Sequence, residues 1–162
     1  ELQIRGPNVL AAYLNNPEAT TRARTPDGWF RTGDLATGQG RRFTYLARLD
    51  DSLRLGGYLV NPAEIESALL LWPGIQGAQV VGARQVGQGD VAVAFVTCQG
   101  AAPGPDMLRA HCHEQLANYK VPVHFQVLDA FPVIHGPNGS KIQKRLLREW
   151  ARQLVDGSPS PG

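Results

Sequence analysis

The sequence predicts an α+β protein of two units, a small β-rich, barrel-like unit followed by a compact α+β unit. Two observations lead to this prediction. Residues 1–49 consist of short alternating polar and apolar segments separated by glycine and proline turns, which is typical of short strands. After residue 50, segments with helical periodicity alternate with strand-like runs, so helices are expected to pack on a small sheet. We expect the second unit to span residues 50–155 and residues 156–162 to be a disordered tail.

Composition excludes several classes of protein. The chain has 162 residues, 43% of them hydrophobic and 19% charged, as in globular domains. A net charge of +2 is too small to indicate nucleic-acid binding, and the longest apolar run, residues 91–96, is too short to cross a membrane. Cys98 and Cys112 lack a metal-binding spacing, so no metal site is expected. A reducing, cytoplasmic location follows as the simpler expectation.

The first unit is expected to contain mostly strands. A helical turn is predicted near Tyr13 and a polar loop over residues 20–26. The predicted strands are residues 1–6, 29–35 and 42–48, the last two joined by a hairpin at residues 38–40. Because residue 1 is not Met and already lies in a strand-like segment, we expect the chain to be part of a longer protein.

The second unit begins with a clearly signalled helix. Apolar residues recur over residues 62–72 at helical spacing. Asn61 is a suitable N-cap, Pro62 suits the first helical position, and Glu64 stands where a capping box has its carboxylate. Further helices are expected at 107–117, with Asp106 as N-cap, and at 142–154 after an open loop at 136–139. The remaining strands are predicted at 75–83, 91–98 and 125–128.

Three places in the sequence are candidates for function. Gly56 and Gly57 indicate a tight turn, or a place where another molecule approaches the backbone closely. Asp34, which follows Thr-Gly at a strand end, could accept hydrogen bonds from a vicinal diol such as ribose; the alternative is a turn in which its side chain bonds nearby backbone N–H groups. Lys141 heads a basic cluster on a loop before the last helix, which suits a phosphate or carboxylate. The alternative for this cluster is a solvated basic helix face.

Five motifs in order resemble the C-terminal part of the AMP-forming, adenylate-forming enzymes, most closely acyl-CoA synthetases. The resemblance covers residues 1–154. The motifs are Glu1-Leu-Gln-Ile-Arg-Gly-Pro with Tyr13-Leu-Asn-Asn-Pro, Gly28-Trp-Phe-Arg-Thr-Gly-Asp34, Arg48-Leu-Asp-Asp through Glu66, Tyr119-Lys-Val-Pro122, and Lys141-Ile-Gln-Lys144. The chain departs from the family pattern at Ala47 and Ser140, where the family has glycine, and at Arg54, where it has lysine.

The resemblance implies a two-step ligation. A carboxylate attacks the α-phosphate of ATP to give acyl-AMP and pyrophosphate, and the thiol of CoA then displaces AMP. Asp34 and Arg48 would bind the nucleotide, and Asp50 would be the hinge on which the C-terminal domain alternates between half-reactions. Gly56 and Gly57 would border the pantetheine tunnel. Lys141 would be the catalytic lysine, with Lys144 as the fallback.

The resemblance also implies partners. Residues 1–49 would be the edge of a large N-terminal AMP-binding domain, and residues 50–155 a mobile lid. ATP (with Mg) and CoA would be substrates of the full-length enzyme, with none bound by this part alone, which we expect to be inactive. A carboxylic acid would be the other substrate, and a homodimer is left open. Two alternatives remain, namely an adenylation domain that loads a carrier protein and a non-catalytic lid or interaction module.

Overall fold

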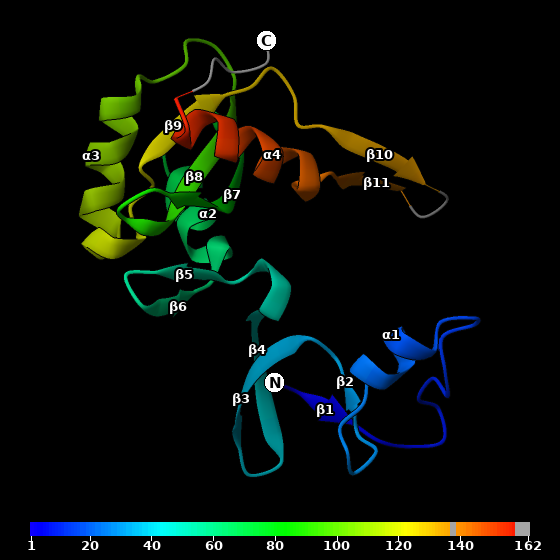
Figure 1. The fold of residues 1–162 in the computed structure, drawn as a ribbon. Helices are drawn as coiled ribbons and strands as arrows, with labels where there is room; N and C mark the ends of the chain where they lie inside the picture. The colour runs from blue at the N-terminus through cyan, green and yellow to red at the C-terminus, as the bar shows by residue number, and fades with distance from the viewer. Residues whose placement is uncertain (137–138, 158–162) are drawn as a thin grey trace. The chain divides into compact units, whose positions relative to one another are not determined.

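The structure is a computed structural model, and it describes residues 1–136 and 139–157 (Figure 1). The chain divides into two compact units, residues 1–52 and the part that begins at Leu53. The sequence places this division three residues earlier, between Leu49 and Asp50. Residues 158–162 of the expected tail lie outside the described residues.

The first unit contains two small antiparallel sheets. Strand β1 pairs with β2, and β3 forms a hairpin with β4, whose register shifts between Leu35 and Ala36. These residues therefore form two separate two-stranded sheets and no closed barrel. The elements are β1 (Gln3–Ile4), α1 (Pro17–Arg22), β2 (Phe30–Arg31), β3 (Asp34–Gln39), β4 (Arg42–Arg48) and a 3₁₀ helix (Leu49–Asp51).

Helix α1 corrects the prediction of a helical turn near Tyr13 and a loop from residue 20. The helix starts later, because Asn16 caps it by accepting a hydrogen bond from the Ala19 N–H at 2.9 Å. Pro17 supplies the fixed φ of a first helical position. The cap and the proline together outweigh the low helix propensity of the two threonines that follow.

The first unit buries little apolar surface. Ala47 is the only hydrophobic residue of residues 1–52 that is buried. Leu14, Phe43 and Tyr45 have exposed fractions of 90%, 63% and 55%. A unit of this size normally needs a larger core to offset the loss of chain entropy on folding.

The second unit is a three-layer arrangement around the sheet β7-β8-β9, in which β7 and β8 are antiparallel and β8 and β9 are parallel. The α+β fold class is confirmed. The elements are β5 (Leu53–Leu55), β6 (Tyr58–Val60), α2 (Pro62–Leu70), β7 (Ile75–Gln85), β8 (Gly89–Cys98), α3 (Pro105–Gln115), a 3₁₀ helix (Asn118–Lys120), β9 (His124–Val127), β10 (Val133–Gly136), β11 (Gly139–Ile142) and α4 (Lys144–Val155).

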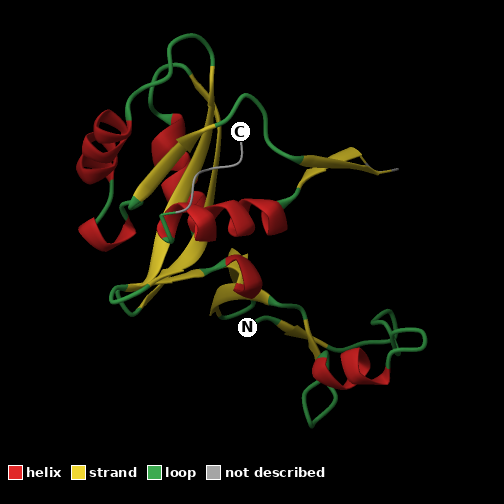
Figure 2. Cartoon of the chain, turned by 45° about the horizontal axis from the view of Figure 1, so that its top comes forward, coloured by secondary structure: helices red, strands yellow, loops and turns green. Residues whose placement is uncertain are grey.

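Helices cover both faces of this sheet, as Figure 2 shows. On one face, Val80 and Ala94 pack in a cluster with residues of α2 and α3. On the other face, Val81 and Phe95 pack against α4. The continuously apolar run of residues 91–96 is buried throughout, which confirms the prediction that this strand is covered on both sides.

Helix starts were predicted with mixed success. The start of α2 is confirmed, because the Asn61 side chain accepts a hydrogen bond from the Ala63 N–H at 3.1 Å and Pro62 is the first helical residue. Helix α3 begins one residue before the predicted N-cap. Asp106 lies inside its first turn and pairs with Arg109 at 2.9 Å.

The C-terminal region differs most from prediction. The predicted open loop and early helix are instead an antiparallel hairpin, β10–β11, in which Ile142 pairs with Val133. Helix α4 starts only at Lys144. The two predicted loop residues at the tip, 137 and 138, lie outside the described residues. No helix in the described part of the chain is long and apolar enough to cross a membrane.

Candidate functional site

Asp34 and Arg48 face each other across the β3–β4 hairpin. They are cross-strand partners, and Arg48 Nε lies 3.5 Å from Asp34 Oδ1. Arg48 Nη2 also donates to the Thr32 carbonyl at 3.2 Å. Within residues 1–52, the Asp34 carboxylate pairs with Arg48 rather than with a nearby backbone N–H, as the turn alternative required.

The backbone around Asp34 is held by neighbouring groups. Thr32 Oγ1 donates to the Leu2 carbonyl at 2.8 Å and accepts from the Asp34 N–H at 3.1 Å. Gly33 adopts a φ of +73°, which glycine allows without strain. The carboxylate is therefore fixed at a strand start with one cationic neighbour, and its other lone pairs can accept hydrogen bonds from hydroxyl groups.

Asp50 lies in the 3₁₀ helix that follows β4, two residues before the first unit ends at Ser52. The Ser52 N–H donates to the Arg48 carbonyl at 3.0 Å, which closes this turn. Its position at the unit boundary is the feature that a hinge requires.

Gly56 and Gly57 form the two-residue turn of the β5–β6 hairpin. Leu55 pairs with Tyr58, and the two glycines have φ values of +56° and +86°. Both values match a type I′ turn, which matches the twist of hairpin strands. A Cβ on Gly57 would meet nothing within 4 Å, whereas one on Gly56 would lie 3.3 Å from Tyr119 Cβ. The turn conformation alone therefore accounts for glycine at Gly57.

Lys120 and Glu64 form an ion pair at 2.5 Å that sequence reasoning missed. The hydrogen bond from Glu64 is the main cause that raises the pKa of Lys120. The pair ties the 3₁₀ helix after α3 to α2, and the adjacent Tyr119 ring lies 4.7 Å from the Tyr58 ring, centroid to centroid. No local pattern could have indicated this pair, because the two residues lie 56 positions apart.

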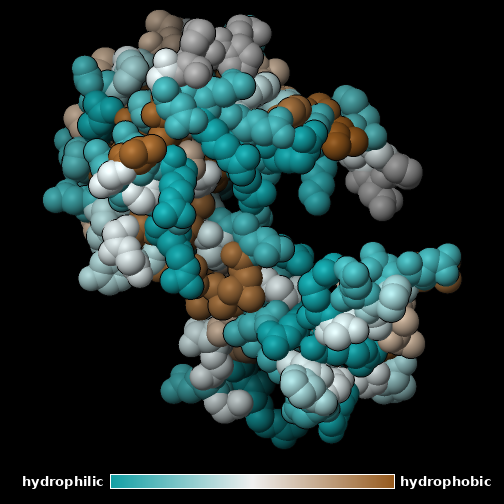
Figure 3. Space-filling view, viewed as in Figure 1, coloured by the Kyte–Doolittle hydropathy of each residue, from teal (hydrophilic) through white to brown (hydrophobic). Residues whose placement is uncertain are grey.

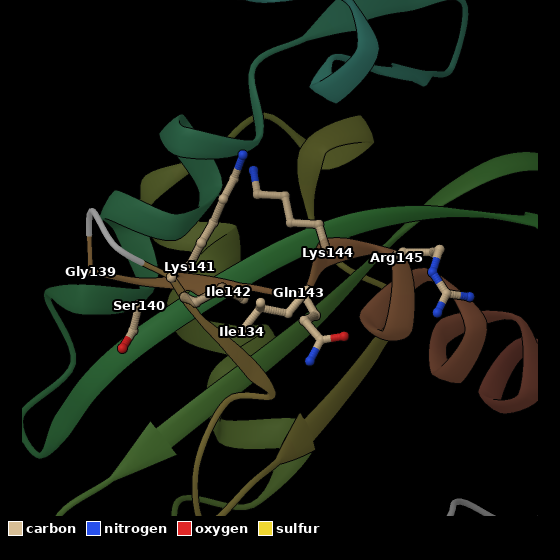
Figure 4. A pocket seen from close by; sticks show the side chains of 9 residues that line it. Ile134, Gly139, Ser140, Lys141, Ile142, Gln143, Lys144 and Arg145 are labelled. Carbon is tan, nitrogen blue, oxygen red and sulfur yellow. The ribbon is translucent and has the colours of Figure 1, made fainter.

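Lys141 lies on strand β11 and not on a loop, where the sequence placed it. Its cross-strand neighbour is Ile134. A hollow of about 610 Å³ is lined by β10, β11 and the start of α4. In Figure 4 the Lys141 and Lys144 side chains extend to the same side, whereas Ser140 points away. Among the described residues, no hydrogen bond or ion pair engages the Lys141 amine.

The first turn of α4 is basic. It begins with Lys144 and Arg145 and contains no acidic residue. Cations at a helix N-terminus oppose the macrodipole, at a cost of a few tenths of a kcal/mol each. Arg145 is balanced by Glu149 at 2.6 Å. The hollow is thus bordered by positive charge and suits an anionic group.

The structure brings some of the predicted site residues together and separates others. Asp34, Arg48 and Asp50 belong to the first unit, whereas Gly56, Gly57, Lys141 and Lys144 belong to the second. The described residues contain no group of three or more His, Cys, Asp or Glu side chains able to hold a metal ion.

Comparison with known proteins identifies the second unit. Residues 64–135 match the AMP-binding enzyme C-terminal domain family. This chain carries an AMP-binding enzyme C-terminal domain and belongs with the adenylate-forming enzymes. The family prediction made from the five motifs is confirmed.

The relatives are CoA ligases. The chain is 40% identical over 157 residues to the 2-succinylbenzoate–CoA ligase of Geobacillus kaustophilus, covering 96% of this chain and 30% of the relative. It is 37% identical over 149 residues to the sulfoacetate–CoA ligase of Cupriavidus necator, covering 91% of this chain and 29% of the relative. The ATP-bound MatB of Rhodopseudomonas palustris superimposes with a TM-score of 0.83 at 32% identity, covering 94% of this chain and 30% of that one.

The chain therefore spans only about 30% of the length of these relatives. The family model ends at His135, on strand β10. The returning strand with Lys141 lies beyond the match to the family model, although the longer matches to whole relatives cover more than nine tenths of the chain.

Proposed function

We propose that this chain is the C-terminal part of an AMP-forming acid–CoA ligase and acts together with a nucleotide-binding N-terminal domain. We call the complete ligase the protein in which this chain follows that domain. The observation that carries the proposal is the placement of Lys141. Its amine stands exposed on a hairpin beside Ile134, with no partner among the described residues.

Lys141 would act in the first half-reaction. The substrate carboxylate forms a bond to the α-phosphorus of ATP, the bond to the β-phosphate oxygen breaks, and pyrophosphate leaves. Negative charge is redistributed over the α-phosphoryl oxygens as this occurs. An ammonium group held there stabilises the transition state, typically by a few kcal/mol of barrier.

The first unit would contribute nucleotide contacts. The Asp34 carboxylate would accept hydrogen bonds from the two ribose hydroxyls, and Arg48 would hold that carboxylate in place while lying near the ribose or phosphate. Rotation about Asp50 would bring the β5–β6 hairpin to the site for the second half-reaction. There the CoA thiol loses its proton, sulfur bonds to the acyl carbon, and AMP leaves.

The thin core of residues 1–52 supports an N-terminal partner domain. With Ala47 as their one buried hydrophobic residue, these 52 residues leave Phe43, Tyr45 and Leu14 exposed. A preceding domain that covers this apolar surface would stabilise the unit. The relatives, of which this chain spans 30%, have the length to supply such a domain.

The substrate remains a class. The two relatives are named for acids as different as 2-succinylbenzoate and sulfoacetate, so what their names share is a carboxylic acid joined to CoA. The acceptor is CoA in the leading proposal. A ligase of the carrier-protein type would instead transfer the acyl group to a phosphopantetheinyl protein, and offering both acceptors to the complete ligase separates these outcomes.

The test compares Lys141→Ala with Lys144→Ala in the complete ligase. Adenylation is measured as acid-dependent pyrophosphate release, and the second step as thioester formation from preformed acyl-adenylate and CoA. Lys141→Ala should slow adenylation by about a hundredfold to a thousandfold. Lys144→Ala should change it little, and neither should alter the second step substantially.

Each outcome decides between the proposals. Unchanged adenylation in both variants would show that this part is a non-catalytic lid. A large loss in Lys144→Ala alone would move the catalytic role to Lys144. The 162-residue chain alone should form no acyl-adenylate, and measurable formation by it would contradict the need for an N-terminal domain.

A further inference from the structure

The hairpin β10–β11 extends from the second unit as an arm (Figure 1). Every residue of its two strands is exposed, apart from the half-buried Ile142. Val133 and Ile134 are 38% and 59% exposed, and the space-filling view shows an apolar patch on this arm (Figure 3). Burial therefore contributes little to holding the two strands in register.

Register matters on this arm because it decides which face carries Lys141. Side chains alternate between the two faces of a strand, so a slip of one residue would move Lys141 to the opposite face. Hairpins without a buried face specify register weakly, and an isolated two-stranded hairpin is marginally stable in water. Something other than packing must fix the pairing.

A side-chain bond supplies this constraint. His135 and Ser140 are cross-strand partners, and His135 Nδ1 lies 2.7 Å from Ser140 Oγ. They lie one position from Ile134 and Lys141, and so on the opposite face of the hairpin. The glycine requirement of the turn is met at Gly139, whose φ is +106°, which leaves the next position open to a serine.

The base of the arm is fastened separately. The Gln143 N–H donates to the Pro132 carbonyl at 2.8 Å, and Gln143 Nε2 donates to the Val133 carbonyl at 3.1 Å. Lys141 therefore lies between two fixed points, with Gln143 on the side of α4 and the His135–Ser140 bond on the side of the tip.

We propose that His135 and Ser140 are positioning residues for Lys141, and that their bond locks the hairpin register that presents the lysine for adenylation. The proposal rests on the proposed function of Lys141. Neither residue touches the reacting groups. Sequence reasoning found no partner for His135, because the bond exists only once the strands pair.

The test uses His135→Ala, Ser140→Ala and the double variant in the complete ligase. Each single variant should lower the adenylation kcat by about tenfold, as expected for a misplaced catalytic group. The double variant should be no slower than either single one, since all three remove the same bond. Ser140→Thr, which keeps the hydroxyl, should retain the wild-type rate.

Two controls separate positioning from a general structural role. Thioester formation from preformed acyl-adenylate and the urea midpoint should stay unchanged in all variants, because the arm is exposed. In a Lys141→Ala background, removing His135 or Ser140 should have no further effect on adenylation.

The outcomes keep the two proposals apart. If Lys141→Ala slows adenylation but His135→Ala and Ser140→Ala do not, the positioning role is wrong and the proposed function stands. Equal losses in both half-reactions would also overturn positioning, since they would indicate general damage to the fold. If Lys141→Ala itself leaves adenylation unchanged, the proposed function fails and the positioning role fails with it.

Discussion

Replacing Gly57 by alanine or asparagine separates two reasons for a glycine at the tip of hairpin β5–β6. One reason is the turn, in which this residue has a φ of +86°. The other is the predicted pantetheine tunnel, where a side chain would obstruct the thiol arm of CoA. The structure makes them separable, because a Cβ at this position meets nothing within 4 Å inside the chain.

The two substitutions should differ in their effect on stability. Alanine at positive φ costs about 1 kcal/mol relative to glycine, which corresponds to a fall in Tm of about 4 °C for a unit of this size. Asparagine visits the left-handed region more readily, so Gly57→Asn should cost only a few tenths of a kcal/mol. Thermal and urea unfolding of the 162-residue chain, followed by circular dichroism, measures both.

The functional assay is thioester formation from preformed acyl-adenylate and CoA in the complete ligase. If Gly57 borders the thiol path, Gly57→Asn should slow this step by about tenfold or more, equivalent to at least about 1.4 kcal/mol of barrier. Adenylation should be unchanged. Gly87→Asn is a matched control, because Gly87 also has a positive φ of +81° and open space around it, but lies in the β7–β8 turn.

The result that refutes the tunnel prediction is a normal thioester rate in Gly57→Asn. Glycine would then serve the type I′ turn alone. An equal loss in Gly87→Asn would instead show that the assay reports stability rather than access of the thiol.

Three further predictions concern Lys120, Cys112 and Asp50. Lys120→Met should lower the free energy of unfolding by about 0.5 kcal/mol at pH 8; because Glu64 raises the Lys120 pKa above 10.5, this contribution should be complete below pH 10.5 and vanish above the raised pKa, and a difference that persists there would exclude the ion pair as its source. Burial raises the pKa of Cys112 to about 11, so in native protein at pH 8 a thiol reagent should modify the half-buried Cys98 first and Cys112 only after unfolding; rapid modification of Cys112 would contradict its burial. Asp50→Pro should impair one half-reaction and spare the other if Asp50 is the hinge, and equal losses in the two would argue against a hinge there.

Local sequence predicted the elements whose signals are short-range. Asn61 and Pro62 specify a helix start because capping involves residues only two or three apart. The run of residues 91–96 could be recognised as a central strand because it is apolar without interruption. Helix α1 was missed because the threonines of residues 17–22 concealed a good cap and first-turn proline.

Short segments near the C-terminus could not be assigned from the sequence. Residues 133–136 and 139–142 each have four residues, and the glycines and proline between them are equally compatible with a loop. Their pairing depends on the register that brings His135 to Ser140. This is why Lys141 was expected on a loop and lies on a strand.

The sequence by itself determined the family, the order of the motifs, the two-unit α+β organisation and the identity of the candidate residues, since each of these is carried by residue type and spacing along the chain. Only the tertiary structure decided which side chains meet. It paired Asp34 with Arg48 through the β3–β4 register, joined Lys120 to Glu64 across 56 positions, and placed Lys141 on one face of an arm whose other face carries the His135–Ser140 bond. The physical reason is that such contacts depend on strand register and on the packing of distant elements, which no local pattern encodes.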